Sequence, residues 1–568
     1  MSRAQMQDPE KLKAVDVKDQ LADDVDELDT ETGVDRAYEL KCALVNRTLQ
    51  EEIGFGRYQL ELFALTGLGW MADNIWLQGI AVVLGQVQQE LDPTRIEFAT
   101  LALYVGLIIG ASTWGVLADV IGRKLSFNIT LFIAGVFGIA AGAAPNFTAF
   151  GALVACVGFG IGGNLPVDGA LFLEHIPQSH QWTLTLLSAW WAIGQLVASV
   201  VAWGFIANYS CDPSIAQGEC MKADNMGWRY TCAWLASHRM AGSITFLMFV
   251  ARFIIFDLQE SSKYLIAKGR DEEALAVLQH LAKRNGRQIS LTIEDFRSIK
   301  GGQVHVTTKD ILRRTFSQMN LSHIKPLFAG RKLAINTSLT ILLWGLIGLA
   351  YPLYNAFLPL YLAERVDADS STYTTYRNYT IISVVGIPGS VLACLIVDWT
   401  RGGKDAVDEE ESGSTESGDG EKGENTTPTH TKRKTKFSLG GRKLSMAIST
   451  LLTGIFLFLF TTSANEAAVL GFSCASGLTQ NAMYGVLYAY TPEVFPAPHR
   501  GTGDAVCSAF NRITGILAPV IKIATTSSAG GAAAAKANGP IFVSASLFVV
   551  ASIAMTLLPI ETAGKAAL

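Results

Sequence analysis

Twelve stretches of about 20 mostly apolar residues recur along the chain, and this pattern limits the fold more than any other feature. Each stretch is long enough to cross the hydrocarbon core of a bilayer as one helix. Only 17% of the residues are charged, below the roughly one quarter of soluble domains. We therefore expect an all-α membrane protein with twelve transmembrane helices. The stretches run roughly over 60–84, 98–118, 126–144, 149–171, 183–206, 234–256, 334–362, 379–398, 443–462, 467–490, 501–523 and 539–559.

The composition argues against several other classes of protein. A net charge of −5 without a basic domain argues against nucleic-acid binding, and 8 cysteines in 568 residues argue against a disulfide-rich secreted fold. No Walker loop and no metal-ligand spacing of histidines is found, so we expect no ATP-driven motor, no metal and no cofactor. The glycine run that starts at Gly158 lies inside an apolar stretch, where a dinucleotide loop has no β-α-β context. We do not expect an enzyme.

Lysine and arginine set the expected orientation, because they are retained on the cytoplasmic side of membrane proteins. They gather in the connections after even-numbered stretches, as at Arg123, Lys124 and Arg500. Both termini and the loop 257–332 are therefore expected to be cytoplasmic, with the plasma membrane as the location. Arg252, at the inner end of the sixth stretch, is expected to reach the cytoplasmic surface.

Two cysteines, Cys211 and Cys220, lie close together in the expected external loop after the fifth stretch. An oxidising compartment would allow them to pair, and the sequence leaves a disulfide and two free thiols equally open.

The chain also contains an internal repeat. Gly122-Arg123-Lys124 recurs as Gly441-Arg442-Lys443, an offset of 319 residues (441 − 122). Glu174 recurs as Glu493 at the same offset (493 − 174 = 319). We therefore expect two pseudo-symmetric six-helix bundles with a path between them near the membrane midplane.

An insertion interrupts the second copy, because Asp119 and Asp398 are only 279 residues apart (398 − 119), which is 40 fewer than 319. The charged segment at about 402–440 has the composition of a disordered insertion. The expected segments are an acidic, mostly disordered cytoplasmic tail (1–56), a first bundle (57–256), a cytoplasmic linker with short helices (257–332), a second bundle (333–559) and a cytoplasmic tail (560–568).

Several of these motifs resemble those of the major facilitator superfamily. The run from Gly115 to Lys124 matches that family's Gly-x-x-x-Asp-x-x-Gly-Arg-Lys loop, and the run from Pro492 to Arg500 resembles its sugar-porter-like branch. The runs at 54–59 and 160–167 resemble its synaptic-vesicle-protein and related organic-ion transporters, and the whole resembles a fungal member. The resemblance covers about residues 54–560 without the insertion and implies alternating access. Val154 stands where members often have arginine, so a gate that uses that arginine cannot be transferred.

A set of loop residues is expected to form a cytoplasmic gate. A carboxylate beside a helix N-terminus is stabilised by the helix dipole, so Asp119 can latch onto the start of the eleventh stretch, and Arg123 can pair with acids that move relative to it. The alternative is that these charges only fix orientation and cap helices. The gate candidates are Gly115, Asp119, Gly122, Arg123, Glu174, Asp398, Arg401, Arg442, Glu493 and Arg500.

Two ionisable residues, Asp73 and Arg512, lie near the middle of the first and eleventh stretches. Such residues are costly in a bilayer and therefore indicate function. Asp73 is the candidate for proton coupling, and Arg512 either contacts an anionic solute or balances Asp73. The alternative for Asp73 is a fixed ion pair or hydrogen bond. Asp168, near the inner end of the fourth stretch, is expected to face either the cavity or the cytoplasm.

Aromatic and amide side chains at helical spacing form a candidate substrate cavity. The alternative is that the aromatic rings anchor at the bilayer surface and the amides tie helices together. The cavity candidates are Trp70, Trp76, Asn164, Trp191, Gln195, Trp344, Tyr354, Asn355, Gln480, Asn481, Tyr484 and Asn511.

These features predict a secondary active transporter, a monomer in the lipid bilayer whose coupling ion is the proton. Uptake of a small sugar-like or organic-acid solute is the leading hypothesis. Export of a drug or metabolite is the second, and a membrane sensor that binds a solute without transporting it is the third.

Overall fold

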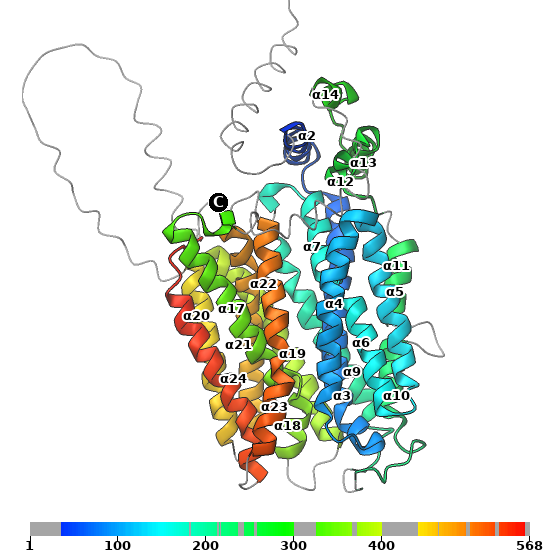
Figure 1. Ribbon diagram of the computed structural model, residues 1–568, viewed down its shortest axis with the longest axis vertical. Helices are drawn as coiled ribbons and strands as arrows, with labels where there is room; N and C mark the ends of the chain where they lie inside the picture. The colour runs from blue at the N-terminus through cyan, green and yellow to red at the C-terminus, as the bar shows by residue number, and fades with distance from the viewer. Residues whose placement is uncertain are drawn as a thin grey trace, which may run out of the picture.

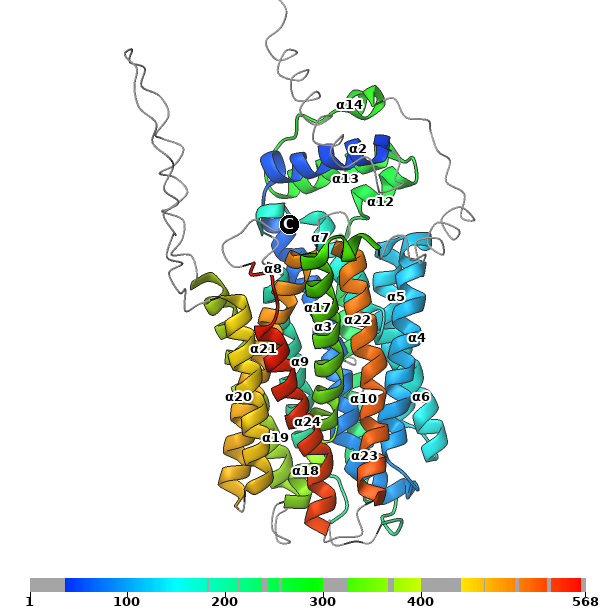
Figure 2. The ribbon, with the colours of Figure 1, turned by 60° about the vertical axis from the view of Figure 1, so that its left-hand side comes forward.

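Two bundles of long helices lie side by side, with a group of short helices at one end, in the computed structural model of the chain (Figures 1 and 2). The structure describes residues 36–180, 183–212, 215, 217–236, 244–254, 258–299, 325–365, 372–399, 441–463, 465–495, 500–528 and 533–562. The insertion at 402–440 and the terminal segments 1–35 and 563–568 lie outside the described residues.

The first bundle corresponds to the first six predicted stretches. Its fourth, fifth and sixth stretches are each made of two helices. The helices are α3 (Arg57–Leu91), α4 (Glu97–Ile121), α5 (Arg123–Gly142), α6 (Phe147–Ile161), α7 (Asn164–His175), α8 (Thr183–Leu186), α9 (Ser188–Ile206), α10 (Met226–Ala236) and α11 (Ile244–Ile254).

The second bundle corresponds to the last six stretches, and its seventh and eleventh stretches are each made of two helices. The helices are α17 (Arg331–Asn355), α18 (Leu358–Arg365), α19 (Thr372–Trp399), α20 (Arg442–Thr462), α21 (Glu466–Val494), α22 (Arg500–Gly515), α23 (Leu517–Ser528) and α24 (Ala533–Thr556). Among the described residues, seven candidate spans are long and apolar enough to cross a membrane by length and composition alone. Helices α3 and α21 are long enough, but polar residues interrupt them.

The two bundles repeat the same packing. In the first bundle, α3 packs on α9, α4 on α6, and α5 on α6, α10 and α11. In the second, α17 packs on α22, α19 on α21, and α20 on α21 and α24. Numbered within each half, these are the same pairs: first with fifth, second with fourth, third with fourth and third with sixth. The contact between the halves is also paired, because α9 packs on α19 while α4 packs on α22 and α23.

Helix caps repeat as well. The side chain of Asn146 accepts a hydrogen bond from the N–H of Ala149 at the start of α6, with an oxygen–nitrogen distance of 2.8 Å. Asn465 does the same for Ala468 at the start of α21, also at 2.8 Å. Their offset is again 319 residues (465 − 146), so the duplication extends to single capping side chains.

Short helices form a cap on one end of the first bundle: α2 (Arg36–Arg47), a π-helical turn (Thr48–Ile53), α12 (Ser262–Ala267), α13 (Asp271–Arg284) and α14 (Ile293–Ser298). Residues 36–53 fall within the predicted acidic tail, yet here they are helical. Lys41 pairs with Asp271 at 2.5 Å, and Glu52 accepts from the N–H of Ser290 at 2.6 Å. We call this end of the molecule the capped end.

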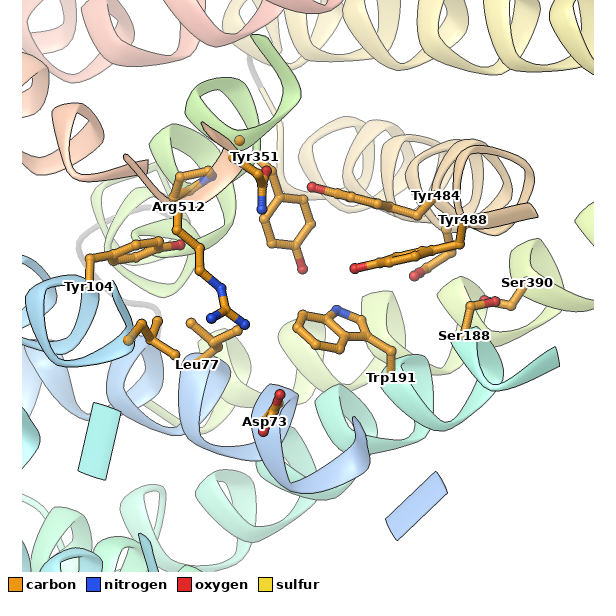
Figure 3. A pocket seen from close by; sticks show the side chains of 15 residues that line it. Asp73, Leu77, Tyr104, Ser188, Trp191, Tyr351, Ser390, Tyr484, Tyr488 and Arg512 are labelled. Carbon is orange, nitrogen blue, oxygen red and sulfur yellow. The ribbon is translucent and has the colours of Figure 1, made fainter. Parts of the chain in front are cut away.

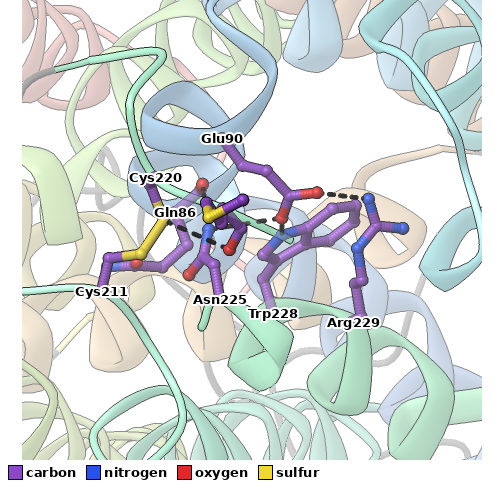
Figure 4. The surroundings of a disulfide bond; sticks show 8 residues. Gln86, Glu90, Cys211, Cys220, Asn225, Trp228 and Arg229 are labelled. Carbon is purple, nitrogen blue, oxygen red and sulfur yellow. Dashed lines mark hydrogen bonds and ion pairs between the residues drawn. A yellow bond between two sulfur atoms is a disulfide. The ribbon is translucent and has the colours of Figure 1, made fainter. Parts of the chain in front are cut away.

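The opposite end carries a disulfide between Cys211 and Cys220, and we call it the disulfide end. The loop with this disulfide is held against the last turns of α3 (Figure 4). Asn225 donates to the carbonyl of Gln86 at 2.8 Å. Glu90 accepts from Nε1 of Trp228 at 2.7 Å and from Arg229 at 2.6 Å.

Candidate functional site

A buried pocket lies between the two bundles, midway along α3 (Figure 3). Helices α3, α4 and α9 of the first bundle and α17, α19, α21 and α22 of the second form its walls. Its lining residues are Asp73, Leu77, Tyr104, Leu107, Ser188, Trp191, Gly348, Tyr351, Pro352, Ser390, Asn481, Tyr484, Tyr488, Asn511 and Arg512.

Opposite charges face each other across this pocket. Asp73 stands on α3 and Arg512 on α22, and their side chains point towards each other in Figure 3. Both residues are buried, with 2% and 7% of their surface exposed. No ion pair between described residues joins them at direct contact distance. The pocket therefore brings together the two charges that were predicted to lie near the middle of the membrane, and it leaves space between them.

Each of these charges has a hydrogen-bond partner. Asn164 donates to Oδ1 of Asp73 at 2.8 Å. Arg512 donates to the carbonyl oxygen of Gly162 at 2.8 Å, which links the two bundles. That carbonyl is free for a partner because the residue four positions later, Pro166, has no N–H to donate to it at the junction of α6 and α7. The glycine run that we noted in the sequence thus provides an acceptor for Arg512.

Aromatic rings surround the charges. Tyr351 and Tyr484 contact edge to face with ring centroids 5.3 Å apart, and Tyr484 stacks on Tyr488 at 6.1 Å. On the capped side of the pocket, Tyr488 also contacts Trp70 at 5.3 Å and Trp344 at 5.1 Å. Trp70 and Trp344 therefore close the pocket behind Tyr488 and do not line it.

A second, smaller chamber adjoins the pocket and shares Tyr351 and Asn481 with it. Its lining carries no charge and combines amide and hydroxyl groups with the apolar side chains of Leu358 and Ile382. Gln480 accepts from the amide of Asn355 at 2.9 Å, while Nε2 of Gln480 is buried without a partner among the described residues. The predicted cavity residues that line this chamber are Gln195, Tyr354, Asn355, Gln480 and Asn481.

Some predicted cavity residues lie elsewhere. Trp76 does not line the pocket, because its fully buried ring faces α11 and its Nε1 donates to Oγ1 of Thr245 at 3.2 Å. Leu77, the next residue, takes the pocket-facing position instead. Asn164 positions Asp73 from behind. Tyr104 was missed, although a polar aromatic residue in an otherwise apolar stretch was a usable signal.

A buried ion pair corrects the expectation for Arg252. Its guanidinium does not reach the surface but pairs with Asp168 at 3.0 Å, and both side chains are 0% exposed. It also donates to the carbonyl of Phe127 at 2.5 Å and lies 3.4 Å from the centre of that ring. The packing of α11 against α5 and the ion pair with Asp168 on α7 take the place of solvent around the guanidinium. Asp168 therefore faces its own bundle.

The predicted gate residues form pairs inside each bundle. Arg123 pairs with Glu174 in the first bundle, and Arg442 pairs with Glu493 in the second. Two further glutamates, not predicted, cap the helices that follow Gly122 and Gly441. The glutamates are Glu260, which accepts from the first N–H groups of α5, and Glu561, which does so for α20.

The described contacts therefore place Arg123 in a pair within its own half. The surroundings of Gly115 and the side chains of Asp119, Asp398 and Arg500 lie outside the description, as does Arg401 entirely. Whether Asp119 forms the predicted latch stays a prediction.

Hydrogen bonds between the bundles also close the pocket on the disulfide side. The amide of Gln78 on α3 donates to the hydroxyl of Tyr351 at 3.1 Å and accepts from the hydroxyl of Tyr379 on α19. One turn further out, Tyr376 donates to the carbonyl of Val82 at 2.6 Å. The pocket is thus enclosed on both sides, by aromatic rings towards the capped end and by hydrogen bonds towards the disulfide end.

Comparisons with known proteins agree with this architecture. The family model of the Major Facilitator Superfamily matches residues 62–404. MFS siderochrome iron transporter 1 of Ceriporiopsis subvermispora is 41% identical over 99% of this chain and 98% of its own length. The major facilitator-type transporter hxnZ of Emericella nidulans is 38% identical over 94% of this chain and 89% of its own.

Among solved structures, a partially occluded inward-open form of the xylose transporter XylE from E. coli aligns with a TM-score of 0.60. It is 16% identical, over 89% of this chain and 99% of its own, so this likeness shows the fold alone. The resemblance seen in the loop motifs and the twelve-helix fold class are confirmed. The chain belongs to the Major Facilitator Superfamily, whose members are multi-pass membrane transporters and not enzymes.

Proposed function

We propose that this chain is a proton-coupled importer of a small organic acid that works by alternating access of its two bundles. The observation that carries the proposal is the placement of Asp73 and Arg512 on facing walls of one buried pocket. An anionic solute would pair with Arg512 and a proton would bind to Asp73, and a bilayer protein retains such charges at a cost of at least about 2.5 kcal/mol each.

The charge balance of the pocket supports coupling to a proton. With Asp73 ionised and Arg512 protonated, the two formal charges cancel. An organic anion that binds to Arg512 leaves the pocket with one uncompensated negative charge, which is costly in a buried site. A proton on Asp73 removes that charge. Binding of the anion and binding of the proton therefore favour each other, which is what a symporter requires.

The remaining surfaces of the pocket suit the rest of such a solute. The rings of Trp191, Tyr484 and Tyr488 offer flat apolar faces to a cyclic solute. The second chamber offers amide and hydroxyl groups, with the unpartnered Nε2 of Gln480 as a donor. A ring that bears a carboxylate and hydroxyl groups would use both spaces.

The proposed cycle starts from the contacts that must break. A solute carboxylate competes with the carbonyl of Gly162 for the guanidinium of Arg512. This competition breaks the hydrogen bond that joins α22 to the fourth stretch. Protonation of Asp73 weakens its attraction for Arg512 at the same time. The bundles can then move relative to each other around the loaded pocket.

We place the capped end in the cytoplasm and the disulfide end outside, at the plasma membrane, with both termini cytoplasmic and the chain acting as a monomer. The basic residues Arg123, Lys124, Arg442 and Lys443 lie at the start of α5 and α20, at the capped end. The disulfide at the other end fits an oxidising compartment.

Uptake into proteoliposomes under an imposed inward proton gradient tests the proposal. The solutes are ring-bearing carboxylates, matched neutral sugars, quaternary ammonium ions and, because one relative is named a siderochrome iron transporter, an anionic iron chelate. We expect a carboxylate or the chelate to accumulate. Asp73→Asn should abolish gradient-driven accumulation while solute exchange across the membrane persists.

Other outcomes would support other functions. Accumulation of a neutral sugar alone would contradict the role given to Arg512. An ammonium ion that leaves the vesicles in exchange for protons would indicate an exporter, because a cation bound at Asp73 displaces its proton. Binding without any flux would indicate a sensor.

A further inference from the structure

A second carboxylate, Asp168, lies one helical turn from the site of Asp73. Asp73 and Gly69 are four residues apart on α3, and Asn164 and Asp168 are four residues apart on α7, so each pair shares one helix face. Asn164 contacts Asp73, and Asp168 lies against Gly69. Since α3 begins and α7 ends at the capped end, Asp168 lies on the capped side of Asp73.

Among the described residues, a partner is found for one of the two carboxylate oxygens of Asp168. Oδ2 accepts from Arg252 at 3.0 Å. Oδ1 of Asp168 is buried and has no hydrogen-bond partner among the described residues, and the same is true of Oδ1 of Asn164. The amide nitrogen of Asn164 is already used by Asp73, so turning the amide over would break that bond.

Two buried acceptors without donors, one turn apart, are costly unless a donor lies between them. A water molecule can supply two hydrogens, one to each oxygen, and a proton on Oδ1 of Asp168 can supply one. Either donor connects the carboxyl of Asp168 with the amide that holds Asp73.

The buried ion pair at the disulfide end of the first bundle offers a comparison, because both oxygens of its carboxylate have partners. Glu90 pairs with Arg229 at 2.6 Å, and its second oxygen accepts from Nε1 of Trp228 at 2.7 Å. Both oxygens of Glu90 are therefore occupied, as expected of a pair that only stabilises the fold. Asp168 is buried at least as deeply, yet one of its oxygens is left for another ligand.

We propose that Asp168 is a second proton-binding group, which shares the coupling proton with Asp73 through a water molecule held by Asn164 and Asp168. The inference rests on the proposed function. The proton leaves the O–H of Asp73, the water accepts it and releases one of its own protons to Oδ1 of Asp168, and no electrons are exchanged. Arg252 stays protonated throughout. Asp168 thereby carries the proton one turn closer to the capped end.

Besides Asp168 itself on α7, the charged and titratable groups of this site come from four helices. Asp73 stands on α3, Arg252 on α11, Arg512 on α22 and Tyr488 on α21. Substitution of Asp73 should therefore change the titration of Asp168, and substitution of Asp168 should change that of Asp73. Substitution of a distant group should change neither.

Infrared difference spectroscopy of the purified full chain, recorded while the pH is stepped, tests the proposal through the carbonyl stretch of protonated carboxylic acids. Asp168→Asn should remove one titrating band and shift the midpoint of the remaining band by at least about one pH unit, because the two groups are coupled. Asp73→Asn should have the reciprocal effect. Glu90→Gln is the matched control and should leave both bands unchanged.

The proposal is overturned if Asp168→Asn leaves every titrating band as in the wild type, because Asp168 is then a permanently ionised partner of Arg252. If Asp168→Asn alone does not fold, the double variant Asp168→Asn, Arg252→Gln keeps the site neutral and hydrogen-bonded and is read in the same way. The spectra need no solute. Failure of gradient-driven uptake with intact band coupling therefore refutes the proposed function alone, and uptake without band coupling refutes the sharing alone.

Discussion

Gly69→Ala should destabilise the first bundle strongly, because Gly69 makes room for the buried ion pair. A Cβ built at this position lies 2.9 Å from Cγ of Asp168 and closer still to Oδ2 of Asp168 and Nη2 of Arg252. Real Cβ atoms do not approach other atoms so closely. The pair is packed on its other side by Phe127, so it cannot withdraw without losing its hydrogen bonds.

The expected cost follows from those contacts. Separating a buried ion pair leaves each charge without its partner, which costs about 3–5 kcal/mol. For a bundle of about 200 residues, each kcal/mol lowers the unfolding midpoint by about 2–4 °C, so a loss of 3 kcal/mol predicts a drop of about 6 °C or more. Thermal unfolding of the purified protein in detergent, followed by tryptophan fluorescence, measures it.

Gly151→Ala is the matched control. Gly151 lies in α6 of the same bundle, and a Cβ there meets nothing within 4 Å. Replacement of an unstrained helical glycine by alanine stabilises by about 0.4–1 kcal/mol, so this variant should unfold at or slightly above the wild-type temperature. Equal midpoints for Gly69→Ala and Gly151→Ala would refute the packing of the pair against α3.

Three further variants test other parts of the structure. Tyr379→Phe removes the hydrogen bond to Gln78 between the bundles, which is worth about 1 kcal/mol, so the population should shift about fivefold towards forms open at the disulfide end. Distances between spin labels across that end measure this shift, and unchanged distances would argue against closure there. Glu561→Ala removes the acceptor for the first N–H groups of α20 and should cost about 1–2 kcal/mol in thermal unfolding, whereas no change would show that water caps this helix equally well. Burial lowers the pKa of Lys263, so the folded state binds fewer protons there than the unfolded chain between that pKa and the usual 10.5. The buried charge therefore lowers the free energy of unfolding by its full amount below the folded-state pKa, and this loss of stability disappears as the pH rises to 10.5. Lys263→Met should raise the unfolding temperature most at pH values below that pKa, and a gain that does not depend on pH would contradict this.

The fold was predictable because it depends on sequence patterns that extend over many residues. The twelve apolar stretches and the repeat at Gly122 and Gly441 give two bundles of six helices, and the structure adds Asn146 and Asn465 at the same spacing. Capping side chains were not recognised in advance because single asparagines are common in loops.

The two midplane charges were also predictable, because ionised side chains are rare inside apolar stretches. Asp73 and Arg512 both reach the pocket. The partner of each was not predictable. Asn164 is 91 residues from Asp73 and Gly162 is 350 residues from Arg512, so only tertiary packing brings them together.

The sequence did not determine which face of each helix points into the pocket, and this limited the prediction of the lining residues. Trp76 and Leu77 are neighbours in sequence, and the period of the helix alone did not decide which of them faces the pocket. The packing of α3 against α11 decides it, since Thr245 offers an acceptor to the indole of Trp76. The Arg123 pair is a similar case, because a loop motif does not say whether its partner belongs to the same bundle.

The number of protons taken up when an organic acid binds tests the central claim most directly. Titration calorimetry of the solute that accumulates in the vesicles, repeated in two buffers of different ionisation enthalpy, gives this number. Two ionised side chains that cancel leave room for one anion and one proton, so the wild type should take up about one proton per bound anion at a pH where Asp73 is ionised, and Asp73→Asn should take up none. Binding with no proton uptake by the wild type, or with proton release, would contradict the account.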